Sequence, residues 1–162
     1  MSTLTTNLNL IKYELTDNVT PSGYNDNFDT IDTQITGLKV DFIVAQGIEN
    51  GWIYRRWNSG VAECWRNVEH SNISVTTAWG SIYETPEAYG APNYPFTFIE
   101  TPIVNLNVQK TTSTSGSYAI MGIERGSSSA STTSPGSWYY LRATSGTGIT
   151  VTTSIYVIGR WR

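Results

Sequence analysis

The sequence contains one cysteine, one histidine and few charges, and these shortages exclude several kinds of chemistry. Cys64 alone can form neither an intrachain disulfide nor a cysteine-cluster metal site, because both need at least two thiolates. His70 lies in a Val-Glu-His-Ser-Asn context without the motif of a serine nucleophile, and we interpret it as a surface histidine in a turn. The sequence therefore predicts no catalytic residues, no metal site and no cofactor.

The distribution of charge argues against a nucleic-acid or membrane partner. Charged residues make up 14% of the 162-residue chain, compared with roughly 25% in an average globular protein. The net charge is −3, and the seven arginines form no basic run that could follow a phosphate backbone. The sequence has no stretch of 18 consecutive apolar residues, and the first ten residues lack the regions of a signal peptide. We expect synthesis in a cytoplasm without secretion, and no membrane insertion.

The residues that are abundant favour β structure. Serine and threonine together number 40, and the chain has six tryptophans and ten tyrosines. Residues 1–41 carry a net charge of −4 (two Lys against one Glu and five Asp), whereas the remainder carries +1 (eight basic against seven acidic residues) and contains no Asp. This change in composition predicts two regions with a border near Asp41.

The N-terminal region predicts an extended arm followed by a short helix. Residues 1–23 are mainly small and polar, and Pro21, Ser22 and Gly23 interrupt the chain. From there, apolar residues recur with spacings of 4, 3, 4 and 3, which is the pattern of helices that pack on one another. The pattern leaves two alternatives, an amphipathic helix that packs on its own domain or a short trimeric coiled coil over residues 24–40. The seam residues are Tyr24, Phe28, Ile31, Ile35 and Leu38.

Residues 41–162 predict an antiparallel β-sandwich head. Aromatic-rich runs at 52–57 and 61–68 flank Asn58-Ser59-Gly60, which is a strong hairpin signal. Seven or eight short strands separated by Gly-, Pro- and Ser-rich loops are typical of a sandwich or barrel. The other expected strands are Phe42–Gln46, Ile73–Thr77, Phe96–Ile99, Ile103–Lys110, Tyr118–Glu124, Trp138–Ala143 and Ile149–Arg160.

Aromatic side chains are the best candidates for ligand contacts, because sugar rings stack on Trp and Tyr faces. Each of them could instead fill the core or a subunit interface, so both interpretations stay open. The candidates lie near a strand end, in the Pro-rich loop 84–95 and after the Ser-rich loop 126–136: Trp79, Tyr83, Tyr89, Tyr94, Trp138, Tyr139 and Tyr140. Glycoside hydrolysis needs two carboxylates about 5–10 Å apart. No pair of the head glutamates forms a motif for it, and we predict that the protein is not an enzyme.

Three segments resemble tail-fibre and receptor-binding proteins of bacteriophages of Gram-positive bacteria. Gly51–Trp65 is similar to their GxWxYRKWxSGxAECW hairpin, with Arg56 where lysine is common. Ser154–Arg162 is similar to their YxIGRWK ending, and Tyr24–Asp32 resembles the FNDNFDxID element near the start of many phage fibre and collar proteins. The resemblance implies a homotrimer with its N-termini toward the virion and a distal β head. The arm is far shorter than a typical fibre shaft.

From the residues and the resemblance together we predict a short trimeric virion fibre, released by lysis and extracellular thereafter. Residues 1–23 would bind another virion protein, and the head would bind a host cell-surface glycan. The alternative is a non-adhesive structural or decoration fibre on the capsid, neck or baseplate. An adhesin would bind host cells or wall glycans as an isolated head, whereas a decoration protein would bind only the virion.

Overall fold

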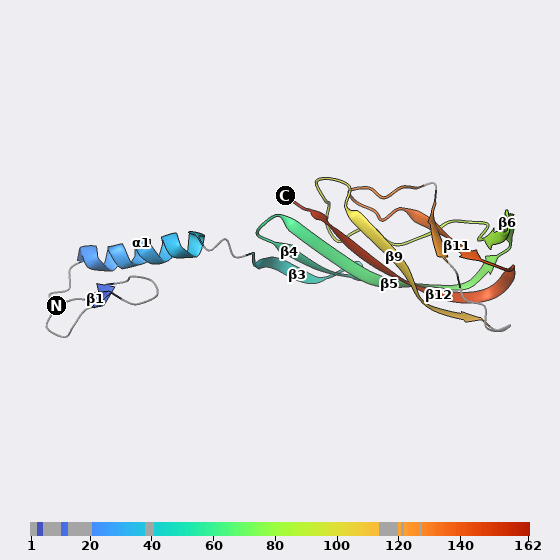
Figure 1. Ribbon diagram of the computed structural model, residues 1–162, viewed down its shortest axis with the longest axis horizontal. Coiled ribbons are helices and arrows are strands. Elements are labelled where there is room, and N and C mark those ends of the chain that lie inside the picture. Colours follow the sequence, from blue (N-terminus) through green and yellow to red (C-terminus); the bar gives the residue numbers. More distant parts are fainter. Residues whose placement is uncertain are drawn as a thin grey trace. The chain divides into compact units, whose positions relative to one another are not determined.

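The computed structural model describes residues 3–4, 11–12, 21–37, 41–113, 120, 122–126 and 128–162. The chain divides into two compact units, Met1–Asp41 and Phe42–Arg162 (Figure 1). No helix among the described residues is long and apolar enough to cross a membrane.

In the first unit, two very short strands precede one helix. The strands β1 (Thr3–Leu4) and β2 (Ile11–Lys12) pair antiparallel. The helix α1 spans Pro21–Gly37, so both of its ends lie three residues before those we predicted. Proline fits the first helical turn, where a missing N–H costs nothing, and glycine commonly ends a helix. The residues that we interpreted as an interruption therefore begin the helix.

The exposed side chains of α1 include part of the predicted seam. Phe28 is 68% exposed and Ile35 is 64% exposed, while Ile31 is half-buried. Two threonine hydroxyls, those of Thr30 and Thr33, donate hydrogen bonds to carbonyl oxygens four residues earlier. Leu38 and the side chain of Tyr24 lie outside the described residues. Phe28 and Ile35 lie seven residues apart and therefore share one side of the helix, which gives the helix an apolar surface that can pack on another element.

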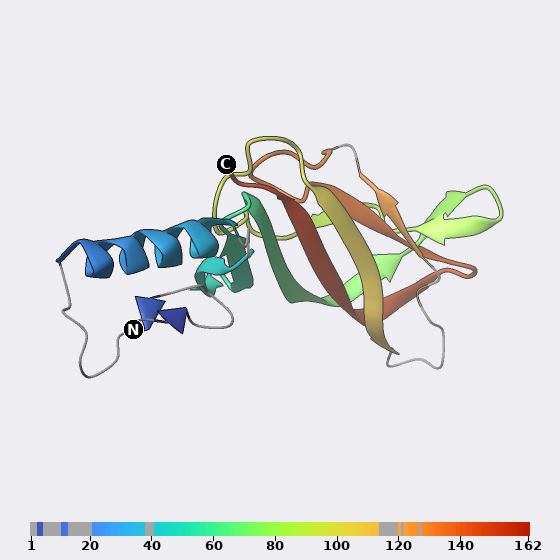
Figure 2. The same cartoon turned by 60° about the vertical axis from the view of Figure 1, so that its left-hand side comes forward.

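The second unit, the head, consists of two antiparallel sheets (Figures 1 and 2). The first sheet has the strand order β3-β4-β5-β12-β9, and Figure 2 shows β5, β12 and β9 side by side. Its strands are β3 (Ile43–Glu49), β4 (Trp52–Trp57), β5 (Val61–Val75), β12 (Gly146–Arg160) and β9 (Ile103–Ser113). The second sheet has the order β10-β11-β7-β6, and β8 also pairs with β11. Its strands are β10 (Gly122–Arg125), β11 (Ser137–Arg142), β7 (Ile82–Glu84), β6 (Thr77–Trp79) and β8 (Tyr89–Gly90).

The core of the head lies between the two sheets. Buried and half-buried residues alternate along β12, and its buried side chains include Val151 and Val157. They share one core cluster with Trp52 of β4 and with Trp138 and Tyr140 of β11. Side chains that alternate between two faces bury one face of each sheet, which is why a Ser- and Thr-rich sequence can still build a core. The prediction of a mainly antiparallel β protein is confirmed.

The hairpin between β4 and β5 is fixed by a glycine and by the end of the sequence. Gly60 has a φ of 91°, and a Cβ atom at this position would lie 2.8 Å from the carbonyl oxygen of Arg162. The backbone N–H of Trp161 donates to the Gly60 carbonyl at 2.9 Å, and its indole N–H donates to the Trp57 carbonyl at 3.1 Å. The hairpin turn and the segment 154–162 are therefore in contact with each other.

Some of the predicted strands differ from those observed. Phe96–Ile99 is not a strand, although Phe98 is buried, because the loop forms backbone hydrogen bonds with Thr132 and Arg160 instead of a ladder. The predicted strands 61–68 and 73–77 are mostly one long strand, β5, which ends at Val75. The predicted strand Tyr118–Glu124 corresponds to β10, and residues 118–119 and 121 lie outside the described part.

Candidate functional site

Three of the seven aromatic candidates belong to the core, and the prediction that they contact a ligand at the surface is wrong. Trp138 and Tyr140 are fully buried, and Tyr94 is 4% exposed. The ring of Tyr94 packs edge-on against Trp52 and Phe98, with centroid distances of 5.6 and 5.3 Å. Tyr94 lies in a long loop, but this loop carries its ring into the core. The loop is held there by the N–H of Tyr94, which donates to the carbonyl of Thr133.

The buried tyrosine of β11 joins the two sheets through hydrogen bonds. The hydroxyl of Tyr140 lies 2.7 Å from Thr153 Oγ1 on β12 and 2.9 Å from His70 Nδ1 on β5. His70 is half-buried in a strand rather than exposed in a turn, which corrects our interpretation of it. Burial lowers the pKa of His70 below 6.5, although a hydrogen bond with the backbone of Gly90 partly opposes this shift. The network is a structural link across the core.

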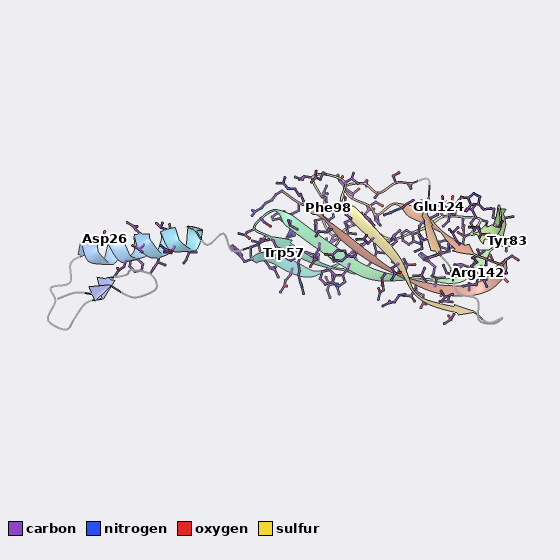
Figure 3. All side chains as sticks on the ribbon, viewed as in Figure 1. Asp26, Trp57, Tyr83, Phe98, Glu124 and Arg142 are labelled. Carbon is purple, nitrogen blue, oxygen red and sulfur yellow. The ribbon has the colours of Figure 1, made fainter. Side chains whose placement is uncertain are left out.

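Tyr89 and Tyr83 lie at the margins of this interior. Tyr89 is half-buried, pairs with Trp138, and its ring centroid lies 4.8 Å from that of His70. Burial raises the pKa of Tyr89, and Glu87 adds to the effect. Tyr83 pairs with Arg142, which is buried, and Figure 3 shows these two residues at the same end of the head. Both tyrosines therefore belong to the inner side of the second sheet.

The remaining two candidates, Trp79 and Tyr139, share the outer face of the second sheet. Trp79 is 47% exposed and Tyr139 is half-buried. Strand register places these residues on the face opposite Tyr140, together with Ile82, Glu84 and Glu124, and we call these five residues the Trp79 face. Its pairs are Trp79–Ile82 and Tyr139–Glu124, and Glu84 pairs with Leu141 between them.

The Trp79 face has the size and the chemistry of an extended binding surface. Neighbouring strands lie about 4.8 Å apart and alternate residues along a strand about 6.8 Å apart, which places the Cα atoms of Trp79 and Tyr139 about 17 Å apart. Two aromatic rings at this spacing can contact separate rings of one oligosaccharide. Glu84 and Glu124 provide hydrogen-bond acceptors for hydroxyl groups between and beside them.

Sequence reasoning missed how this face is built. It did not predict the hairpin of β6 and β7, which orients Trp79 outward. A signal was present, because Gly80 and Ser81 form a two-residue loop between short apolar runs, and Gly80 has a φ of 61°. The strands have only three residues each, which is too short for their alternation to be recognised with confidence from the pattern.

Shallow depressions also lie elsewhere on the described part of the head, and two of them are lined as follows. One, of about 190 Å³, is lined by Val104, Asn105, Leu106, Ile123 and Arg125. The guanidinium of Arg125 donates to the carbonyl oxygens of Pro135 and Val104, so it connects β10 with neighbouring segments. The second, of about 340 Å³, lies along β3 and β4. Its lining residues are Gln46, Gly47, Ile48, Ile53, Tyr54 and Arg55.

Comparisons with known proteins add no assignment. No protein-family model, no curated protein and no solved structure matched the chain.

Proposed function

We propose that the chain is a structural protein of a tailed-phage virion, a homotrimeric fibre whose head binds a glycan on the host surface. The observation that carries the proposal is the Trp79 face, where Trp79 and Tyr139 share one outer sheet face with Glu84 between them and Glu124 beside Tyr139. The resemblance of the hairpin 52–65 to phage receptor-binding proteins supports the virion context. In this proposal residues 1–23 bind another virion protein.

The helix supports the trimeric part of the proposal. Phe28 and Ile35 recur seven residues apart with most of their side chains exposed, and Ile31 lies between them. A helix of 17 residues is marginal alone in water, so packing against the same helix of other chains would stabilise it. Three heads on one fibre also convert a weak site into adhesion, and we expect a monovalent Kd near 1 mM, or about 4 kcal/mol.

The position of the Trp79 face suits a distal ligand. Figure 1 shows β6 at one end of the head, while β3 begins at the opposite end, where the helical unit joins the chain. Figure 3 likewise shows Tyr83 and Trp57 at opposite ends of the head. A fibre anchored through its N-terminal unit could thus present the hairpin of β6 and β7 away from the attachment point.

The test is a binding screen of the full chain against host cells and cell-wall glycans, followed by the variants Trp79→Ala and Tyr139→Ala. We expect each variant to lose about tenfold in affinity, or about 1.4 kcal/mol, because exposed aromatic residues commonly dominate small binding sites. Ile99→Ala is the control, since Ile99 is 57% exposed but lies in a loop that is not part of the Trp79 face. Equal binding by the aromatic variants and the control would contradict the assignment of this face.

Two further results would favour the rival functions. Attachment to virions through residues 1–23 without any binding to cells or glycans would favour a non-adhesive structural fibre. Glycan cleavage that disappears in the variant with both Glu84→Gln and Glu124→Gln would show an enzyme, because these carboxylates lie on the same face. We expect no cleavage by the natural sequence.

A further inference from the structure

The outer face of the first sheet carries an unusual amount of exposed apolar surface. Cross-strand pairing aligns Ile48, Ile53, Trp65 and Tyr156 in one row over four neighbouring strands. Ile48 is 75% exposed, Ile53 is 41% exposed and Tyr156 is 38% exposed. The next row adds Ile158 and Ile103, and Ile103 is 66% exposed. We call these six side chains the apolar band.

The apolar band covers only part of its sheet face. The neighbouring row in one direction is polar, because Asn67 pairs with Ser154 and Ser154 pairs with Asn107. The row after it contains Glu69 and Thr152. The apolar residues therefore lie toward the start of β3, whereas the polar rows lie farther along the sheet. Exposed apolar side chains scattered at random would not produce this division, and a contiguous patch of this kind marks an interaction site.

The charged groups within the apolar band neutralise each other. The carboxylate of Glu63 accepts a hydrogen bond from the Tyr156 hydroxyl at 2.5 Å and lies 3.8 Å from the guanidinium of Arg55. That guanidinium also lies over the ring of Trp65, 5.3 Å from its centroid. The Glu63 side chain is only 15% exposed. Because the carboxylate is both ion-paired and hydrogen-bonded, this face can lose its water on contact with a partner without leaving an isolated charge. For the same reason the face does not repel an identical face.

These properties fit a second copy of the chain better than they fit a glycan or a membrane. Branched aliphatic side chains offer few hydrogen bonds to sugar hydroxyls, and the band has no excess of positive charge for an anionic lipid surface. Four strand spacings of about 4.8 Å and two rows, each about 6.8 Å wide, give a face of roughly 260 Å² per chain. That area is too small for a stable interface alone, for which about 800 Å² per partner is usual, and the exposed seam of α1 would supply part of the remainder.

Chain connectivity places these two apolar surfaces near each other in sequence. Only five residues separate Gly37 at the end of α1 from Ile43 at the start of β3, and the six steps between these two residues span at most about 22 Å. If the helices of several chains associate, the starts of their β3 strands are held at a high local concentration. The apolar band lies in the half of the sheet that contains the start of β3, whereas the polar rows lie in the other half.

We infer that the apolar band is a surface through which the heads of identical chains associate, in addition to the helical seam. The inference rests on the proposed homotrimeric fibre and goes beyond it by assigning the contact to one face of the head. It also separates the two faces by role, since the first sheet is used for assembly and the Trp79 face is left for a ligand.

The test compares the reactivity of two introduced cysteines in the full chain, together with its mass in solution. Ile48→Cys places a thiol in the apolar band, and Asn67→Cys places one in the polar row of the same face. The natural Cys64 contributes little background, because it is fully buried. In the assembled protein we expect maleimide to modify Ile48→Cys on the order of tenfold more slowly than Asn67→Cys, because the protected thiol reacts only in the dissociated fraction. Near-ultraviolet circular dichroism checks that both variants keep the native aromatic core.

A second variant tests the energetic contribution. Ile53→Asp should raise the dissociation constant of the oligomer at least about tenfold, because it brings an unpaired charge into the contact. Asn67→Asp is the matched control and should leave the oligomer unchanged. Equal maleimide rates in a trimer, with no effect of Ile53→Asp, would overturn the inference but leave the fibre proposal standing. A monomeric natural chain would overturn both, and protection of Ile48→Cys in a monomer would show instead that the chain covers its own band.

Discussion

Removing the hydroxyl of Tyr140 tests whether the link between the two sheets stabilises the head. Tyr140 and Thr153 are both fully buried, and the hydroxyl lies 2.7 Å from Thr153 Oγ1 and 2.9 Å from His70 Nδ1. Tyr140→Phe keeps the ring but leaves two polar atoms without this partner. We expect a loss of about 2 kcal/mol in the free energy of unfolding, within the range for a buried group that loses its hydrogen bond. For a head of 121 residues (42–162) this corresponds to a decrease of about 6–10 °C in Tm.

The measurement is urea unfolding at fixed protein concentration, and it includes two further variants. Tyr139→Phe, the adjacent residue on the opposite face, should change the free energy of unfolding by less than about 0.5 kcal/mol. Combining Tyr140→Phe with Thr153→Val should cost about 1 kcal/mol less than the sum of the single variants, because the second change removes a hydroxyl that the first left unpaired. Strict additivity, or equal effects at Tyr139 and Tyr140, would refute the link.

Three other predictions concern groups buried in the head. Burial raises the pKa of the Cys64 thiol to about 12, so a disulfide reagent at pH 8 should modify it slowly in the native protein and rapidly in guanidinium. Because the folded pKa of His70 lies below 6.5, His70 binds its proton at a higher pH in the unfolded chain than in the folded one. The contribution of His70 to stability should therefore be lost as the pH falls from 6.5 through the folded pKa. Proton NMR of the folded protein should give a titration midpoint under 6.5, and His70→Gln should weaken the dependence of Tm on pH above the range in which carboxylates titrate. In thermal unfolding, Gly136→Ala should destabilise the head by more than about 2 kcal/mol, because the added Cβ would overlap backbone atoms of Ser128 and Ser129. Gly80 has a similar positive φ but open space around it, so Gly80→Ala should cost about 1 kcal/mol in the same assay.

The sequence predicted the parts of the fold that depend on local chemistry. The hairpin of β4 and β5 has aromatic runs on both sides of a turn in which Gly60 takes a positive φ, and both signals are local. The helix was also predicted, but its start was misplaced, because Pro21 can either interrupt a chain or begin a helix. Phe96–Ile99 was wrongly predicted as a strand, since its apolar side chains are buried from a loop that distant backbone groups hold in place.

The candidate site was less predictable, because it depends on which side of a sheet each residue faces. Trp138, Tyr139 and Tyr140 are adjacent in sequence and equally aromatic, but alternation buries the first and the third and leaves the second on the outer face. A shift of one residue would exchange these roles, and no local feature of the run determines the register. The pairing of β11 with β10, β7 and β8 determines it, and of these strands β7 and β8, with three and two residues, are too short to be recognised in the sequence.

The position of β12 affects the order in which the head can fold during synthesis. This strand is the last of the head to leave the ribosome, yet it pairs with both β5 and β9 and so occupies an inner position of its sheet. Until residues 146–160 are available, β5 and β9 have exposed edges, whereas α1 was synthesised more than a hundred residues earlier. If the helices associate as in the proposed fibre, chains made on neighbouring ribosomes would meet before any head is closed, and an unfinished sheet would then be open to the β12 strand of a neighbour. Rapid completion of each chain would favour heads built from a single polypeptide.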